Sequence, residues 1–188
     1  MSSETAGRGS DTDGEQGRVL IVEDETDLAE MYAAYLPEYE TTIAGGGEEG
    51  LDAIGGGFDV VLLDRRMPVV SGNEVLAAIE QRGIDCRVAM VTAVDPDFEI
   101  IDLQIDDYVV KPVRRGELRE TVDRLFTLDE YDERMRTLTT KKIKRNLLEV
   151  EKARTALSNS EEFQRLQEEI AALEAEVETL ADELDIDG

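Results

Sequence analysis

The sequence predicts an α/β fold: a doubly wound, five-stranded parallel sheet with strand order 2-1-3-4-5, followed by a C-terminal helical hairpin or coiled coil. Two observations support this prediction. Up to about residue 126, short β-branched apolar runs alternate with helix-like stretches, as in parallel strands that are buried on both faces. Beyond that point, apolar residues recur at helical spacing in a segment without glycine or proline, which is typical of paired helices.

Five runs are the predicted strands. Each is bounded by polar or turn-forming residues, and four of them are rich in valine, leucine or isoleucine. The second run is short and polar, so it gives the weakest strand signal. The predicted strands are residues 19–22, 40–44, 59–63, 87–91 and 108–110.

Helices are predicted between these strands. The first ends before Pro37, because proline cannot continue a helix, and Asp95-Pro96 is expected to begin a short fourth helix. The fifth places an apolar stripe toward the sheet, formed by Leu118, Val122, Leu125 and Phe126. The predicted helices are residues 26–36, 48–54, 73–81, the short helix from Asp95, and 114–126.

The C-terminal part predicts two helices of opposite charge. Residues 131–157 hold eight bases against four acids, whereas 160–187 hold one base against eleven acids. The second helix shows strict heptad spacing, and Ser158 with Glu161 is expected to form its capping box. Opposite charge and a short joint favour an antiparallel hairpin within one chain. The competing geometry is a parallel homodimer through the second helix.

The predicted organisation is a disordered acidic tail (1–17), a first domain (18–126), a linker (127–130) and the helical hairpin (131–188). The chain carries 45 acidic and 20 basic residues, for a net charge of -25, yet 41% of it is hydrophobic, which is too much for a wholly disordered chain. Arginine outnumbers lysine fifteen to five, a composition typical of proteins adapted to molar salt. Without a long apolar span or signal-like segment, we expect a soluble, cytoplasmic protein that contacts no membrane.

Two absences restrict the chemistry. The chain has no histidine, which excludes phosphohistidine relay, Ser-His hydrolysis and His-ligated zinc within it. Cys86 is the single cysteine, so no internal disulfide or cysteine-based metal site can form.

Polar residues follow four of the predicted strands. These are Glu23-Asp24, Asp64, Thr92 and Lys111, and they should meet beyond the carboxyl ends of the strands. Three close carboxylates repel unless they bind a cation, and an all-oxygen set suits Mg²⁺. A carboxylate can also take up a phosphoryl group as an aspartyl-phosphate, with a metal and a lysine neutralising charge. The sequence therefore predicts a Mg²⁺-dependent phosphoryl-accepting site.

A glycine-rich segment offers an alternative. Residues 45–50 fit the G-x-G-x-x-G pattern of dinucleotide-binding proteins, between a predicted strand and a helix. Glu48 and Glu49 would lie in the first helical turn, where they would repel a pyrophosphate. Dinucleotide binding is therefore disfavoured.

Over residues 18–126 the sequence resembles the receiver domain of two-component response regulators. The matching residues are Glu23-Asp24, Asp64, Met67-Pro68, Gly72, Thr92-Ala93, Tyr108 and Lys111-Pro112. The resemblance implies a flavodoxin-like fold with Asp64 as phosphoacceptor. It also implies a Mg²⁺ site in which Asp24 binds the ion directly, Glu23 binds it through water, and Asp64 and the backbone carbonyl of Arg66 complete the set.

The resemblance further implies a switch. Lys111 would pair with the phosphoryl oxygens, Thr92 would bond one of them, and Tyr108 would follow Thr92 inward. Pro112 is the candidate for a cis peptide bond.

The resemblance also has implications for how long the phosphoryl group stays on Asp64 and where it comes from. Arg66 and Val94 match the positions that flank the hydrolytic water in receivers. Neither offers a carboxylate or an amide, so we expect slow self-dephosphorylation. The phosphoryl group would come from a sensor histidine kinase or a small-molecule donor.

The extension after residue 126, together with the salt-adapted composition, resembles haloarchaeal receiver proteins that carry a HalX domain. We therefore expect a signalling protein of the two-component system rather than an enzyme. Its output would be interaction with transcription machinery or another protein, with homodimerisation as a further option. The alternative is a transcriptional regulator that binds DNA through the basic segment 134–154.

Overall fold

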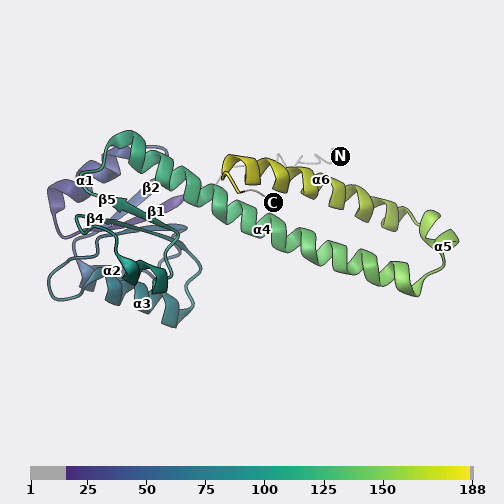
Figure 1. Ribbon diagram of the computed structural model, residues 1–188, viewed down its shortest axis with the longest axis horizontal. Helices are drawn as coiled ribbons and strands as arrows, with labels where there is room; N and C mark the ends of the chain where they lie inside the picture. The colour runs from purple at the N-terminus through teal and green to yellow at the C-terminus, as the bar shows by residue number, and fades with distance from the viewer. Residues whose placement is uncertain (1–15, 187–188) are drawn as a thin grey trace, which may run out of the picture.

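The computed structural model describes residues 16–186 and contains a five-stranded, wholly parallel sheet (Figure 1). Its order, β2-β1-β3-β4-β5, confirms the predicted topology. The expected disordered tail falls mainly on residues 1–15, outside the described residues. The strands are β1 Arg18–Val22, β2 Glu40–Ala44, β3 Val60–Leu63, β4 Arg87–Thr92 and β5 Asp107–Val110.

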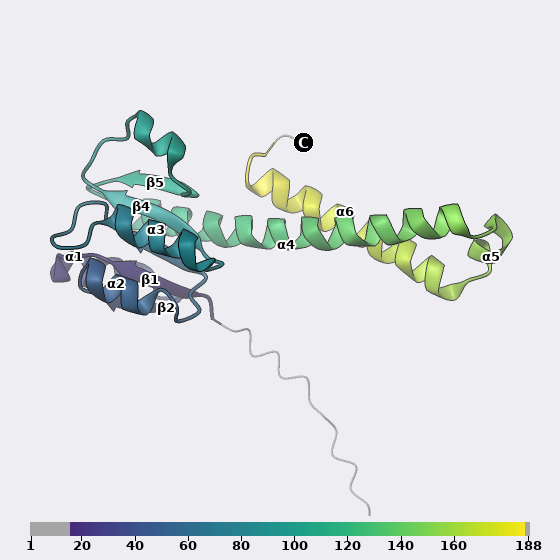
Figure 2. The same ribbon diagram turned by 90° about the horizontal axis from the view of Figure 1, so that it is seen from below.

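Helices cover both faces of the sheet because alternate strand residues point to opposite sides. On one face, α1 (Thr26–Tyr35) and the first turns of α4 (Arg115–Glu151) pack against residues such as Ile21 and Leu62. On the other, α2 (Gly47–Ala53) and α3 (Gly72–Arg82) pack against residues such as Leu20 and Leu63. The two layers are visible in Figures 1 and 2.

The predicted fourth helix is replaced by a single 3₁₀ turn, η1 (Phe98–Asp102), whose first turn is capped by the Asp97 side chain. None of its residues is buried, and Phe98 and Ile101 are exposed. Because Phe98 and Ile101 do not pack on the sheet, little tertiary contact supports a longer helix here.

The predicted end of the fifth helix at Phe126 is wrong. Residues 127–130 lie within α4, which runs without a break for 37 residues out of the sheet domain (Figure 1). The segment contains no glycine, proline or capping signal that would end a helix, and Thr127 Oγ1 donates to the carbonyl of Asp123 one turn earlier.

The tip of the hairpin also differs from expectation. A short helix, α5 (Arg154–Ser158), precedes α6 (Glu161–Glu183). The cap of α6 is Ser160, whose Oγ accepts a hydrogen bond from the Phe163 amide at 3.2 Å. Ser158 instead donates to the carbonyl of Thr155, so the capping box predicted for it is wrong.

The helices α4 and α6 form an antiparallel hairpin within the chain (Figures 1 and 2). Leu138 of α4 and the α6 residues Phe163 and Ile170 are buried. The apolar edge of α6 faces α4, so the parallel dimer through α6 is not the observed geometry. Three ion pairs run in antiparallel register: Arg134–Glu176 at 3.1 Å, Lys141–Glu169 at 2.7 Å and Lys142–Glu174 at 2.7 Å.

Within residues 16–186, no helix combines the length and the hydropathy needed to cross a membrane.

Candidate functional site

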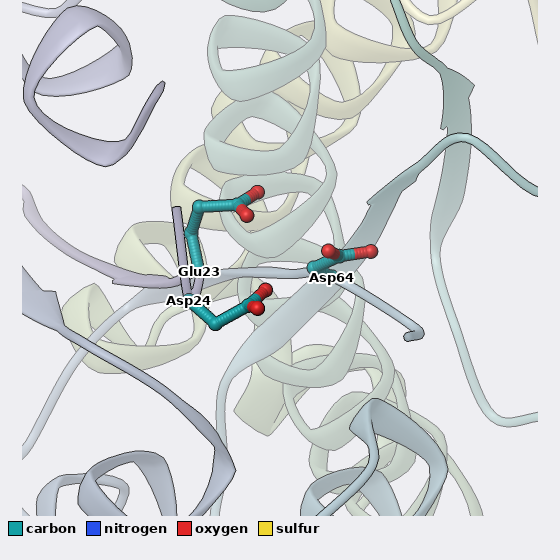
Figure 3. A group of neighbouring side chains, drawn as sticks. All are labelled: Glu23, Asp24 and Asp64. Carbon is teal, nitrogen blue, oxygen red and sulfur yellow. The ribbon is translucent and has the colours of Figure 1, made fainter. Parts of the chain in front are cut away.

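Three carboxylates meet at the carboxyl ends of two neighbouring strands. Glu23 and Asp24 follow β1, and Asp64 follows β3, which pairs with β1 in parallel. One oxygen from each carboxylate lies within 4.8 Å of the others. Figure 3 shows the Glu23 and Asp24 side chains extending toward the Asp64 side of the site. The strand pairing brings together residues that are about 40 positions apart in the sequence.

Lys111, which follows β5, brings a positive charge to this cluster. Its Nζ donates to Glu23 Oε2 at 2.7 Å and to Asp64 Oδ2 at 3.2 Å. Glu23 and Asp64 are buried, whereas Asp24 is more exposed. The Lys111–Pro112 peptide bond is cis.

Burial and ion pairing have opposite effects on the pKa values of Glu23 and Lys111. Burial raises the pKa of Glu23, and its hydrogen bonds from Lys111 and the Glu25 amide offset only part of that rise. Burial lowers the pKa of Lys111, but the hydrogen bond to Glu23 and the charge of Asp64 outweigh it, so the Lys111 pKa is raised overall. Lys111 therefore stays protonated at neutral pH.

The donor set fits a hard cation. One ammonium faces three carboxylates, which leaves acidic oxygens without a balancing charge. All the donors are oxygens, and Asp24 keeps one side of the cluster open to solvent. Mg²⁺ prefers this arrangement because it binds one or two carboxylates and keeps waters that a phosphoryl group can replace.

The loop after Asp64 approaches the acceptor closely. A Cβ at Gly72 would lie 2.1 Å from the Asp64 carbonyl oxygen, so only glycine fits there. The Gly72 amide donates to the carbonyl of Arg65 at 3.0 Å. Arg66 is exposed, and its amide lies 3.3 Å from Asp64 Oδ1, which places the Arg66 backbone beside the acceptor.

The proposed switch residues lie on the next two strands. Thr92 is fully buried at the end of β4, and its Oγ1 accepts from the Val94 amide at 3.4 Å. The Tyr108 hydroxyl, on β5, donates to the carbonyl of Val94 at 2.7 Å. This hydrogen bond links Tyr108 to the loop that follows Thr92.

Arg65 is a residue of the site that no motif in the sequence indicates. Its Nη2 donates to Glu99 Oε2 on η1 at 2.5 Å. The neighbouring Tyr108 and Glu99 side chains raise the pKa of Arg65. Arg65 therefore connects the acceptor loop to η1. No local pattern could reveal this contact, because 34 positions separate Arg65 and Glu99.

A parallel α/β domain with this acidic, lysine-bearing pocket is of the class that accepts phosphoryl groups in signalling. The chain belongs to the response regulator receiver domain family, whose model matches residues 19–123, and a HalX domain follows at residues 127–187. Both resemblances drawn from the sequence are confirmed.

Several curated proteins are similar. A candidate transcriptional regulator of Haloferax volcanii is 46% identical over 120 residues, which are 63% of this chain and 21% of that protein. The transcriptional regulatory protein DltR of Streptococcus agalactiae is 36% identical over 107 residues, which are 54% of this chain and 48% of that protein. The chain thus spans about half or less of the length of these relatives.

Solved structures show the same fold. The signal receiver domain of a LuxO-type repressor from Vibrio parahaemolyticus has a TM-score of 0.60 and 27% identity, covering 63% of this chain and 95% of that one. Response regulator TrrA from Thermotoga maritima, solved in complex with Mg²⁺-BeF, has a TM-score of 0.52 and 36% identity, covering 58% and 98%. These likenesses support a phosphorylation-dependent response regulator.

Proposed function

We propose that this chain accepts a phosphoryl group on Asp64 with Mg²⁺ and relays the signal to its helical arm (α4 beyond residue 126, α5 and α6). The observation that carries the proposal is the meeting of three carboxylates with the Lys111 ammonium at one edge of the sheet. Mg²⁺ held by Glu23, Asp24, Asp64 and the Arg66 carbonyl would supply charge neutralisation for the phosphoryl oxygens.

The chain's own residues supply the remaining chemistry. An Asp64 carboxylate oxygen attacks phosphorus and forms the acyl-phosphate bond, while the bond from phosphorus to the donor atom breaks and its electron pair leaves with the donor. Lys111 Nζ, 3.2 Å from Asp64 Oδ2, holds a positive charge where the phosphoryl oxygens arrive. The Thr92 hydroxyl then bonds one of those oxygens, and the resulting shift of the loop carrying Val94 is passed to Tyr108. Since the chain has no histidine, a sensor histidine kinase is the proposed donor.

The proposed output is a protein interaction of the arm, with transcription machinery or another protein as partner. DNA binding through residues 134–154 is less well supported, because Arg134, Lys141 and Lys142 form ion pairs with glutamates of α6. Phosphate contacts also weaken steeply as salt rises, and a net charge of -25 opposes binding to a polyanion.

The proposal is tested by incubating the chain with acetyl phosphate and Mg²⁺ and measuring its intact mass. We expect one added phosphoryl group in the wild type and none in Asp64→Asn. Asp24→Ala should lose nearly all labelling because a metal ligand is gone, whereas Asp52→Asn, an exposed acid on α2, should label normally. Labelling that survives in Asp64→Asn would refute the assignment.

A further inference from the structure

The face of α4 that points away from α6 carries an unpartnered apolar stripe. Ile143, Leu147 and Val150 are 63%, 60% and 81% exposed. Their spacing of four and three residues puts them on one side of the helix. Leu138, on the opposite side, is buried against α6. We call Ile143, Leu147 and Val150 the α4 stripe. Single exposed apolar residues are common on protein surfaces, but an aligned set indicates an interaction surface.

Two opposite charges flank the α4 stripe on the same side. Lys144 and Glu151 are seven residues apart, so they lie within about 20° of each other around the helix. Among the described residues, neither forms an ion pair with another residue of the chain, whereas Lys141 and Lys142 both pair with α6. Lys144 and Glu151 are about 10 Å apart along the axis, too far to pair with each other.

We propose that a second copy of this chain covers the α4 stripe, with the two α4 helices antiparallel about a two-fold axis beside Leu147. In this arrangement, Ile143 of one copy packs near Val150 of the other, and the two Leu147 side chains meet at the axis. Lys144 of each copy then faces Glu151 of the other, so the pair forms twice. A parallel two-fold arrangement would put the Lys144 and Glu151 side chains of the two copies on opposite flanks of the contact, where they could not pair, so the ion pairs select the antiparallel arrangement.

The charge distribution favours a second copy over other occupants. Each chain carries -25, so two copies can meet only where their surfaces are least acidic. The stripe lies on the basic helix, and the acidic α6 lies behind α4, on the side away from the contact. Nucleic acid would leave the three apolar side chains uncovered and would face Glu151 with its phosphates.

The contact is small, so the dimer should be weak and depend on protein concentration. Salt should strengthen it, because screening reduces the repulsion between two strongly acidic chains. The proposal rests on the interaction output proposed above. Its test uses unphosphorylated protein, so failure of dimerisation and failure of Asp64 phosphorylation are told apart.

Sedimentation equilibrium of the full chain in molar KCl tests the association. We expect a reversible monomer–dimer equilibrium in the wild type and, for Leu147→Asp, a dissociation constant raised roughly tenfold or more. Ile101→Asp is the matched control, because Ile101 is also an exposed apolar residue but lies on η1. A monomeric wild type, or a Leu147→Asp variant that dimerises like the control, would overturn the proposal.

Cross-linking tests the orientation, in a Cys86→Ser background that removes the native thiol. With a short bis-maleimide, Leu147→Cys should cross-link between copies because the two residues adjoin the axis. Arg136→Cys lies on the same face but far from the axis, and the two copies of that residue would be about 35 Å apart. Equal cross-linking at both positions would mean a parallel or random association and would overturn the antiparallel model.

Discussion

Replacing Arg87 with methionine is expected to lower the free energy of unfolding by about 1–3 kcal/mol. Arg87 begins β4 and contacts three carboxylates: Nη2 lies 2.5 Å from Asp132 Oδ2, Nε 3.1 Å from Asp129 Oδ1, and Nη1 3.3 Å from Asp106 Oδ1. Asp129 and Asp132 lie on α4 where the helix leaves the sheet domain. Arg87 thus fastens the base of the arm to the receiver domain.

The magnitude follows from the exposure of the partners. The side chains of Asp129 and Asp132 are 51% and 42% exposed, so each pair should contribute well under about 1 kcal/mol. Asp106 is only 23% exposed and also accepts from the Val88 amide, so its bond to Arg87 should contribute about 1 kcal/mol. Methionine keeps the apolar stem of the side chain. The decrease in the free energy of unfolding therefore measures mainly the effect of removing the positive charge, including the repulsion among the three carboxylates left behind.

The assay is urea denaturation at one fixed KCl concentration. With a slope of about 2 kcal/mol per molar urea, the midpoint should fall by about 0.5–1.5 M. Arg124→Met removes a single ion pair, with Asp107, and should cost less than about 1 kcal/mol. Amide exchange over residues 126–133 should also rise in Arg87→Met. A midpoint equal to that of the wild type or of Arg124→Met would refute this role for Arg87.

Three further predictions concern the acceptor loop and the thiol. Replacing Arg66 with Asn and Val94 with Glu should speed loss of phosphoryl from Asp64 by about tenfold or more, because the new side chains can orient water; an unchanged half-life by intact mass would show that they do not. Gly72→Ala should cost about 2 kcal/mol or more in thermal or urea unfolding and slow phosphorylation, because its Cβ would lie 2.1 Å from a backbone oxygen; wild-type behaviour in both would contradict this. Burial raises the pKa of Cys86 to about 11, so the reactive thiolate is scarce at pH 8, and its alkylation by iodoacetamide should accelerate as pH rises toward 11; a rate at pH 8 like that of a free thiol would contradict the burial.

Local patterns along the chain are enough to predict the sheet and the composition of the site. Strand runs such as Val60–Leu63 are local patterns, and a parallel sheet places the carboxyl ends of its strands at one edge. The sequence alone therefore predicts that Asp64 lies near Glu23 and Lys111, as the structure shows. The sequence also favours the hairpin, because opposite charge and heptad spacing are properties of each helix alone.

How these parts are joined depends on long-range contacts that no local pattern shows. Residues 127–130 contain no glycine or proline that would end a helix, but the absence of a break does not by itself require one helix to run through them, and in the structure α4 is continuous there. The contacts of Arg65 with Glu99, and of Arg87 with Asp132, join positions 34 and 45 residues apart. Such pairs depend on where loops and helices dock, and the energy of docking is spread over many contacts rather than encoded in any short segment.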